Sequence, residues 1–186
     1  RMVTICTKSA NLARVRGIAE DNDGVFFAFG IHPMSVADEP LINAQRLIDE
    51  ARHPKMVGIG ETGLDYHYTA DTAVLQQASL RVHIEAAQET GLPLIIHARA
   101  ADEDMARILA DGMARAPYSC VMHCFSSGAQ LATAALEMGF YLSMSGIAVF
   151  PRSTEIREIF AAAPRDRILV ETDAPYLAPP PRRGKR

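Results

Sequence analysis

Short apolar runs alternate with helix-like segments along the whole chain, and this alternation constrains the fold more than any other feature of the sequence. Most of the runs are apolar at nearly every position, which is typical of strands that are covered on both faces. The runs expected to form strands are Met2–Thr7, Val25–Gly30, Met56–Gly60, Pro93–His97, Ser119–His123, Tyr141–Met144 and Arg167–Glu171.

The segments between these runs have helical composition. The clearest is Asp71–Thr90, which Gly91 ends. Within it, Leu80, Ile84 and Ala87 fall on one apolar stripe. A succession of strand–helix units without a linker or an internal repeat predicts one parallel α/β domain over residues 1–186. The other expected helices are Ser9–Glu20, Leu41–Arg52, Asp102–Ala114, Ala129–Met138 and Thr154–Ala163.

Two parallel architectures fit this order, a closed (β/α)8 barrel and an open doubly wound sheet. No glycine-rich phosphate-binding fingerprint follows any strand-like run, which disfavours the dinucleotide-binding form of the open sheet. A complete barrel usually takes ~250 residues. Seven runs in 186 residues therefore predict an incomplete (β/α)8 barrel of the TIM type. We interpret Arg1 and the basic run Arg182–Arg186 as truncation points at the two ends.

Composition and charge exclude several classes of protein. The net charge of −3 leaves no broad basic surface for nucleic acid, so attraction for phosphate must be local. Cys6, Cys120 and Cys124 lie in or beside apolar runs, which favours buried thiols in a reducing, cytoplasmic compartment. No run of about 18 apolar residues occurs, so no transmembrane span is expected. Nothing indicates an obligate protein partner, and a monomer is expected.

Metal-binding residue types recur at the carboxyl ends of the expected strands. Glu61, His97, His123 and Asp173 each close or follow a different run. In a barrel these ends converge on the one face that carries the active site. Two imidazoles and two carboxylates suit zinc, manganese or a similar divalent ion, and magnesium if the carboxylates dominate. The sequence therefore predicts a metal site built from four separate strands.

Other residues near the strand ends are weaker candidates. His32 and His67 follow strands and can line the same pocket, and Arg99 is a candidate phosphate contact because its guanidinium matches phosphate oxygens. His53 precedes a proline at a helix end, where a surface or capping role is expected, and His83 lies inside a helix and is assigned no function.

Several motifs together resemble the TatD family of metal-dependent deoxyribonucleases, in that family's order and spacing and over essentially the whole chain. The stretches Ser143–Gly146 and Arg183–Lys185 also match. The five motifs that carry the resemblance are Gly30–Pro33, Gly58–Tyr66, Leu92–Arg99, His123–Ser126 and Glu171–Pro179.

The resemblance implies a TIM-barrel hydrolase that cuts DNA, often from an end, with two divalent ions (Mg, Mn or Zn). By this resemblance Glu61 bridges the ions, His97 and His123 hold one of them, and Asp173 holds the other. Glu61 and Asp173 are then the expected catalytic residues.

The resemblance also gives roles at the edge of the pocket and points to departures from the family. His32 and Arg99 match positions that line the pocket, where substrate contacts are expected, and Lys185 is a further candidate contact with the DNA backbone. The family's first strand, with its His-x-His pair, and its final helix are missing here, and Ser126–Gly128 departs slightly from the family's turn. We therefore expect these 186 residues alone to hold at most one ion weakly and to turn over slowly or not at all.

The ligand set leaves other functions open. The same activated water attacks amides, lactones, phosphotriesters and, within this relationship, D-aminoacyl-tRNA, so another barrel hydrolase fits the ligands equally well. A non-catalytic binding protein and a structural domain with satisfied histidines are the remaining alternatives.

Overall fold

The computed structural model describes residues 1–178 and 182. Its strands are all parallel and form one sheet in chain order, so that each strand pairs with the next along the sequence. This order has no reversal, whereas a doubly wound sheet reverses at its ligand-binding switch point. The strands are β1 (Met2–Cys6), β2 (Val25–Phe29), β3 (Met56–Asp65), β4 (Leu94–Arg99), β5 (Cys120–Met122), β6 (Tyr141–Met144) and β7 (Ile168–Val170).

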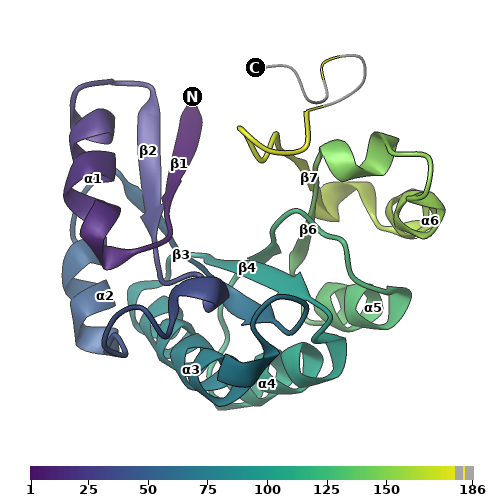
Figure 1. Cartoon of the computed structure of the whole chain (residues 1–186), viewed down its shortest axis with the longest axis horizontal. Coiled ribbons are helices and arrows are strands. Elements are labelled where there is room, and N and C mark those ends of the chain that lie inside the picture. Colours follow the sequence, from purple (N-terminus) through teal and green to yellow (C-terminus); the bar gives the residue numbers. More distant parts are fainter. Residues whose placement is uncertain (179–181, 183–186) are drawn as a thin grey trace.

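The sheet curls into an open barrel, and the helices cover its convex outer side (Figure 1). β1 and β7 are the two edges of this sheet and do not pair with each other. The predicted incomplete barrel of the TIM type is therefore confirmed. The helices are α1 (Leu12–Glu20), α2 (Ala44–Ala51), α3 (Ala73–Thr90), α4 (Asp102–Arg115), α5 (Ala129–Glu137) and α6 (Thr154–Ala162).

Burial along the sheet follows the position of each strand. In β2, Phe27, Ala28 and Phe29 are completely buried, because helices cover one face of the strand and the barrel interior the other. Met2 in β1 and Val170 in β7 are exposed, because the edge strands have a neighbour on one side only. The near-continuous apolar character of the inner strands is thus explained by burial on both faces.

Helix α3 packs on β3 and ends where the sequence predicts. Gly91 adopts a left-handed conformation with φ of 69°, which glycine tolerates without steric cost, and its N–H bonds to the carbonyl of Ala87. Leu80 and Ile84 are completely buried, as the apolar stripe predicts. The same helix also buries three polar side chains that no stripe predicts, Gln76, Ser79 and His83.

The predicted end of β3 at Gly60 is wrong, because the strand continues to Asp65. Pairing with β4 shifts between Gly60 and Thr62, so that Glu61 occupies a bulge and has no partner in the register. A β-bulge changes the direction of a side chain, and regular pairing of the two strands continues after it. Gly63 then pairs with His97 at a backbone approach too close for any side chain on Gly63.

The three cysteines are free thiols. Cys6 and Cys120 are buried thiols, and Cys124 is partly buried, with its Sγ 3.0 Å from the Oγ of Ser145. Lys185 lies outside the described residues. Among the residues that are described, no helix is long and apolar enough to cross a membrane.

Candidate metal centre

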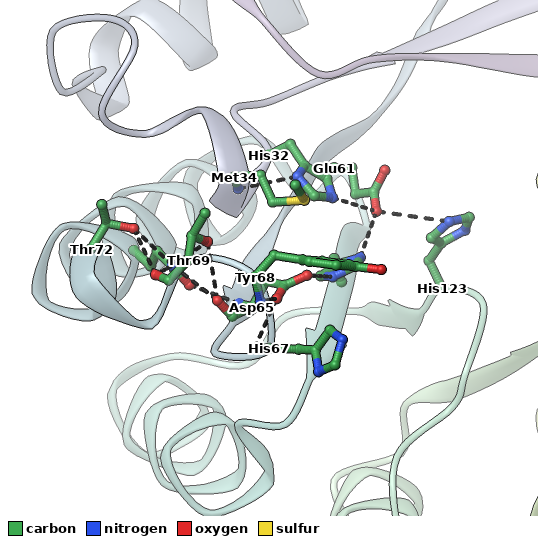
Figure 2. A network of polar contacts seen from close by, with 11 residues as sticks. His32, Met34, Glu61, Asp65, His67, Tyr68, Thr69, Thr72 and His123 are labelled. Carbon is green, nitrogen blue, oxygen red and sulfur yellow. Dashed lines mark hydrogen bonds and ion pairs between the residues drawn. The ribbon is translucent and has the colours of Figure 1, made fainter.

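Glu61 is the hub of a cluster of imidazoles at the carboxyl ends of the strands. Its side chain is buried, with 8% of the residue exposed. The Oε1 atom of Glu61 lies 3.2 Å from Nδ1 of His97, 3.5 Å from Nε2 of His32 and 3.8 Å from Nε2 of His123. Figure 2 shows these contacts converging on the carboxylate from different sides.

The pKa of the Glu61 carboxyl is lowered. Burial is the largest single influence and raises this pKa, but the hydrogen bond from His97 and the charges of His123 and His32 together outweigh it. Glu61 is therefore an anion at neutral pH, ready to share its oxygen with a cation.

A buried carboxylate orients the His97 ring. Nε2 of His97 donates to Oδ2 of Asp65 at 3.1 Å, and Asp65 is completely buried at the end of β3. Because Asp65 keeps the proton on Nε2, a metal ion that replaces the proton shared by Nδ1 and Glu61 would meet a free lone pair on Nδ1. Carboxylate–histidine pairs of this kind fix the tautomer of histidines that bind metals.

A second carboxylate orients His123 in the opposite sense. Nδ1 of His123 donates to Oε2 of Glu171 at 2.9 Å, which leaves Nε2 facing Glu61 and, at 3.4 Å, Oδ1 of Asp173. Glu171 is itself held by the Ser143 hydroxyl at 2.8 Å and by the backbone N–H of Cys124 at 2.7 Å. The side chain of Asp173 thus joins the cluster through His123.

The pKa of His123 is raised to about 10. Burial, the largest influence, lowers this pKa, but hydrogen bonds to Asp173 and Glu171 and the charge of Glu61 more than compensate. A divalent cation bound among these carboxylates has to replace the His123 proton, so its binding would release protons.

His32 differs from His97 and His123, because its outer ring nitrogen accepts a hydrogen bond, whereas theirs donate one to a carboxylate. Its Nδ1 accepts a hydrogen bond from the backbone N–H of Met34 at 3.2 Å, so the neutral ring carries its proton on Nε2, which faces Glu61. Burial, partly opposed by the charge of Glu61, lowers the pKa of His32 to about 4, and the ring is neutral at pH 7. His32 is therefore arranged to donate a hydrogen bond.

The donor set fits a divalent ion. One ligand atom each from His32, Glu61 and His97 lies within 4.8 Å of the others, as around a single ion. Of these, His97 can coordinate through Nδ1 and keep its hydrogen bond to Asp65, whereas His32 can coordinate through Nε2 only by giving up the Met34 hydrogen bond. His123 supplies a second oriented imidazole on the other side of Glu61.

The sequence pattern identified the side chains that meet here but not the residues that orient them. Asp65 and Glu171 lie 32 and 48 residues from the histidines they contact. A signal was present, since each lies within two to four residues of an expected metal ligand, Glu61 or Asp173, inside the same motif.

The remaining histidines and Arg99 take separate positions. His53 contacts Glu20 at 3.0 Å, outside the cluster. His83 is completely buried, accepts the Ile31 N–H at 3.1 Å and so holds the backbone beside His32. His67 and Arg99 both lie against Tyr68, near the cluster but not in it.

The chain is similar to known proteins over most of its length. The model of the family described as TatD related DNase matches residues 1–186. The chain is 38% identical to an uncharacterized metal-dependent hydrolase, YcfH, of Escherichia coli K12, over 98% of this chain and 68% of that protein. It is 31% identical to the 3′-5′ ssDNA/RNA exonuclease TatD of Klebsiella pneumoniae, over 87% of this chain and 62% of that protein.

A solved structure shows the same arrangement of strands and helices. The crystal structure of YJJV, a TatD homologue from Escherichia coli K12, superposes with a TM-score of 0.89 at 27% identity, covering 99% of this chain and 71% of that one. Together with the match of the family model over the whole chain, this likeness establishes that the chain belongs to the TatD family of metal-dependent hydrolases.

Proposed function

We propose that the protein carrying this chain hydrolyses phosphodiester bonds of DNA, as an exonuclease dependent on divalent metal ions. The observation that supports this most is the pair of imidazoles, His97 and His123, each oriented by a buried or half-buried carboxylate toward the shared oxygen of Glu61. The similarity to a 3′-5′ ssDNA/RNA exonuclease of Klebsiella pneumoniae favours nucleic acid over other substrates of metal-dependent hydrolases.

In this proposal Glu61 lies between two ions, His97 and His123 hold one of them, and Asp173 holds the other. Such ions, when bound, lower the pKa of coordinated water toward ~7 and neutralise charge on the phosphoryl oxygens. The Oδ1 atom of Asp173, 3.4 Å from Nε2 of His123, is the proposed acceptor of a proton from the attacking water.

His32 and Arg99 are the proposed substrate contacts. The Nε2–H of His32 points into the cluster and can donate to a phosphoryl oxygen, because its Nδ1 is already satisfied by the Met34 N–H. The guanidinium of Arg99 is exposed and offers a planar pair of donors to a neighbouring phosphate.

The different roles of His32 and His97 are separable by substitution. Loss of a residue that only orients a metal ligand weakens metal binding by ~10–100-fold. We expect His97→Gln, which removes a ligand itself, to weaken Mn²⁺ binding by more than this. His32→Gln should leave Mn²⁺ affinity within about three-fold and lower kcat by roughly 100-fold, the effect of losing one oriented donor. Calorimetric Mn²⁺ titration and single-turnover cleavage measure the two quantities. An equal loss of Mn²⁺ affinity in both variants would make His32 a ligand.

A substrate panel tests the proposed function itself. With the protein that carries this chain and Mn²⁺ present, we expect end-labelled single-stranded DNA to shorten progressively, and an aryl ester, a lactone and a D-aminoacyl-tRNA to remain intact. Hydrolysis of one of the latter without DNA cleavage would favour another hydrolase of the barrel type. No hydrolysis at all, with a melting temperature that does not respond to Mn²⁺, would favour a non-catalytic protein.

A further inference from the structure

Three exposed side chains form a platform beside the metal centre. The guanidinium carbon of Arg99 lies 4.7 Å from the centroid of the Tyr68 ring, within the range of a cation–π contact. The His67 ring meets Tyr68 edge-on, with centroids 4.5 Å apart and an angle of 77° between the planes. We call His67, Tyr68 and Arg99 the aromatic platform. Figure 2 shows His67 and Tyr68 next to the cluster around Glu61.

The platform is tied to a proposed metal ligand through one carboxylate. Oδ1 of Asp65 accepts the backbone N–H groups of His67 at 3.0 Å and Tyr68 at 2.8 Å, while Oδ2 of Asp65 contacts Nε2 of His97. Arg99 follows His97 by two residues in β4, so both side chains leave the same face of the strand. The platform and the metal centre therefore keep a fixed relation to each other.

A buried side chain of α3 anchors the loop that carries Tyr68. Nε2 of Gln76, in α3, donates to the carbonyl oxygens of Thr69 at 2.7 Å and Asp65 at 3.2 Å, and its Oε1 accepts the Asp65 N–H at 2.7 Å. Gln76 is completely buried. An exposed ring on a loop anchored in this way is pre-organised, which lowers the entropy cost of binding.

The Tyr68 side chain contributes little to the packing of the loop, because 58% of the residue is exposed. Neither its hydroxyl nor the Arg99 guanidinium has a hydrogen-bond or ion-pair partner among residues 1–178 and 182. An exposed aromatic ring and a guanidinium without an ion-pair partner among the described residues match the two parts of a nucleotide, a base that stacks and a phosphate that pairs with arginine.

We propose that the aromatic platform is a subsite that stacks one unpaired base of a single DNA strand next to the bond being hydrolysed. The proposal rests on the proposed function and adds to it the residues that contact a base of the substrate. A base inside a duplex has both faces covered by its neighbours, so the platform selects a single strand or a frayed end.

Binding to two oligonucleotides tests the subsite. Fluorescence anisotropy in Ca²⁺ buffer compares labelled oligothymidylate with an abasic oligonucleotide of the same length. We expect Tyr68→Ala to weaken oligothymidylate binding by roughly ten-fold, within the range for one stacked base, and to leave abasic binding within about two-fold. Tyr68→Phe keeps the ring and should bind like the wild type. The matched control is Tyr141→Ala, which removes another arginine-stacked tyrosine, at the amino end of β6.

The subsite would be overturned by equal affinity of the wild-type protein for both oligonucleotides, or by an unchanged affinity of Tyr68→Ala for oligothymidylate. An equal loss on both oligonucleotides would also overturn it, because that pattern indicates a general effect on the loop. Cleavage is measured separately with Mn²⁺. Base-dependent binding without DNA cleavage would reject the proposed function and retain the subsite, whereas cleavage without base-dependent binding would do the reverse.

Discussion

Glu61→Gln is expected to abolish divalent-ion binding and DNA hydrolysis while leaving the protein folded. Glutamine keeps the shape of the side chain but removes the charge to which three imidazole nitrogens point. We expect Mn²⁺ affinity to fall by at least about 100-fold and turnover by at least about 1000-fold, because an ion without its shared anionic ligand neither binds nor activates water. Calorimetry and cleavage kinetics measure these losses.

Folding and specificity controls accompany this variant. His123 keeps two carboxylate partners, Glu171 and Asp173, when Glu61 is neutral, so thermal unfolding should remain cooperative. Glu137→Gln, which neutralises an exposed carboxylate at the end of α5, should retain wild-type Mn²⁺ affinity. A Glu61→Gln protein that binds Mn²⁺ as tightly as the wild type would show that the cluster is not the metal centre.

Gly63→Ala is expected to be the most destabilising single-methyl change in the sheet. Gly63 pairs with His97 across β3 and β4, and a Cβ at this position would overlap the carbonyl oxygen of His97. Its φ of 144° is also strained for any residue with a side chain. We expect the free energy of unfolding to fall by more than about 4 kcal/mol, the range of severe steric and backbone effects. Urea denaturation gives this value directly.

A matched glycine substitution separates this effect from a general cost of adding a methyl group. Gly17 lies inside α1, and nothing lies within 4 Å of the position that its Cβ would take. Gly17→Ala should therefore stabilise the protein by roughly 0.5–1 kcal/mol through helix propensity. Equal stabilities of Gly63→Ala and wild type would contradict the close approach of β3 and β4 on which the position of His97 depends.

The sequence alone predicts the fold class and the residues that meet at the centre. Strand-like runs and helix stops such as Gly91 are local signals, because burial on both faces and the left-handed glycine act within a few residues. Parallel strands in a barrel bring their carboxyl ends together, so four metal-binding residue types at four strand ends predict a cluster before any contact is known. Glu61, His97, His123 and Asp173 do lie in one chain of contacts.

The tertiary structure decides how these side chains are presented. The bulge that aims Glu61 arises from the pairing of β3 with β4, and neither strand encodes it alone. Which nitrogen of His97 or His123 faces the cluster depends on Asp65 and Glu171. Burial of a polar residue such as Gln76 likewise depends on partners that the loop before α3 brings to it. Such contacts join segments that are distant in the sequence and approach each other only in the folded sheet. No local sequence pattern can therefore predict their geometry.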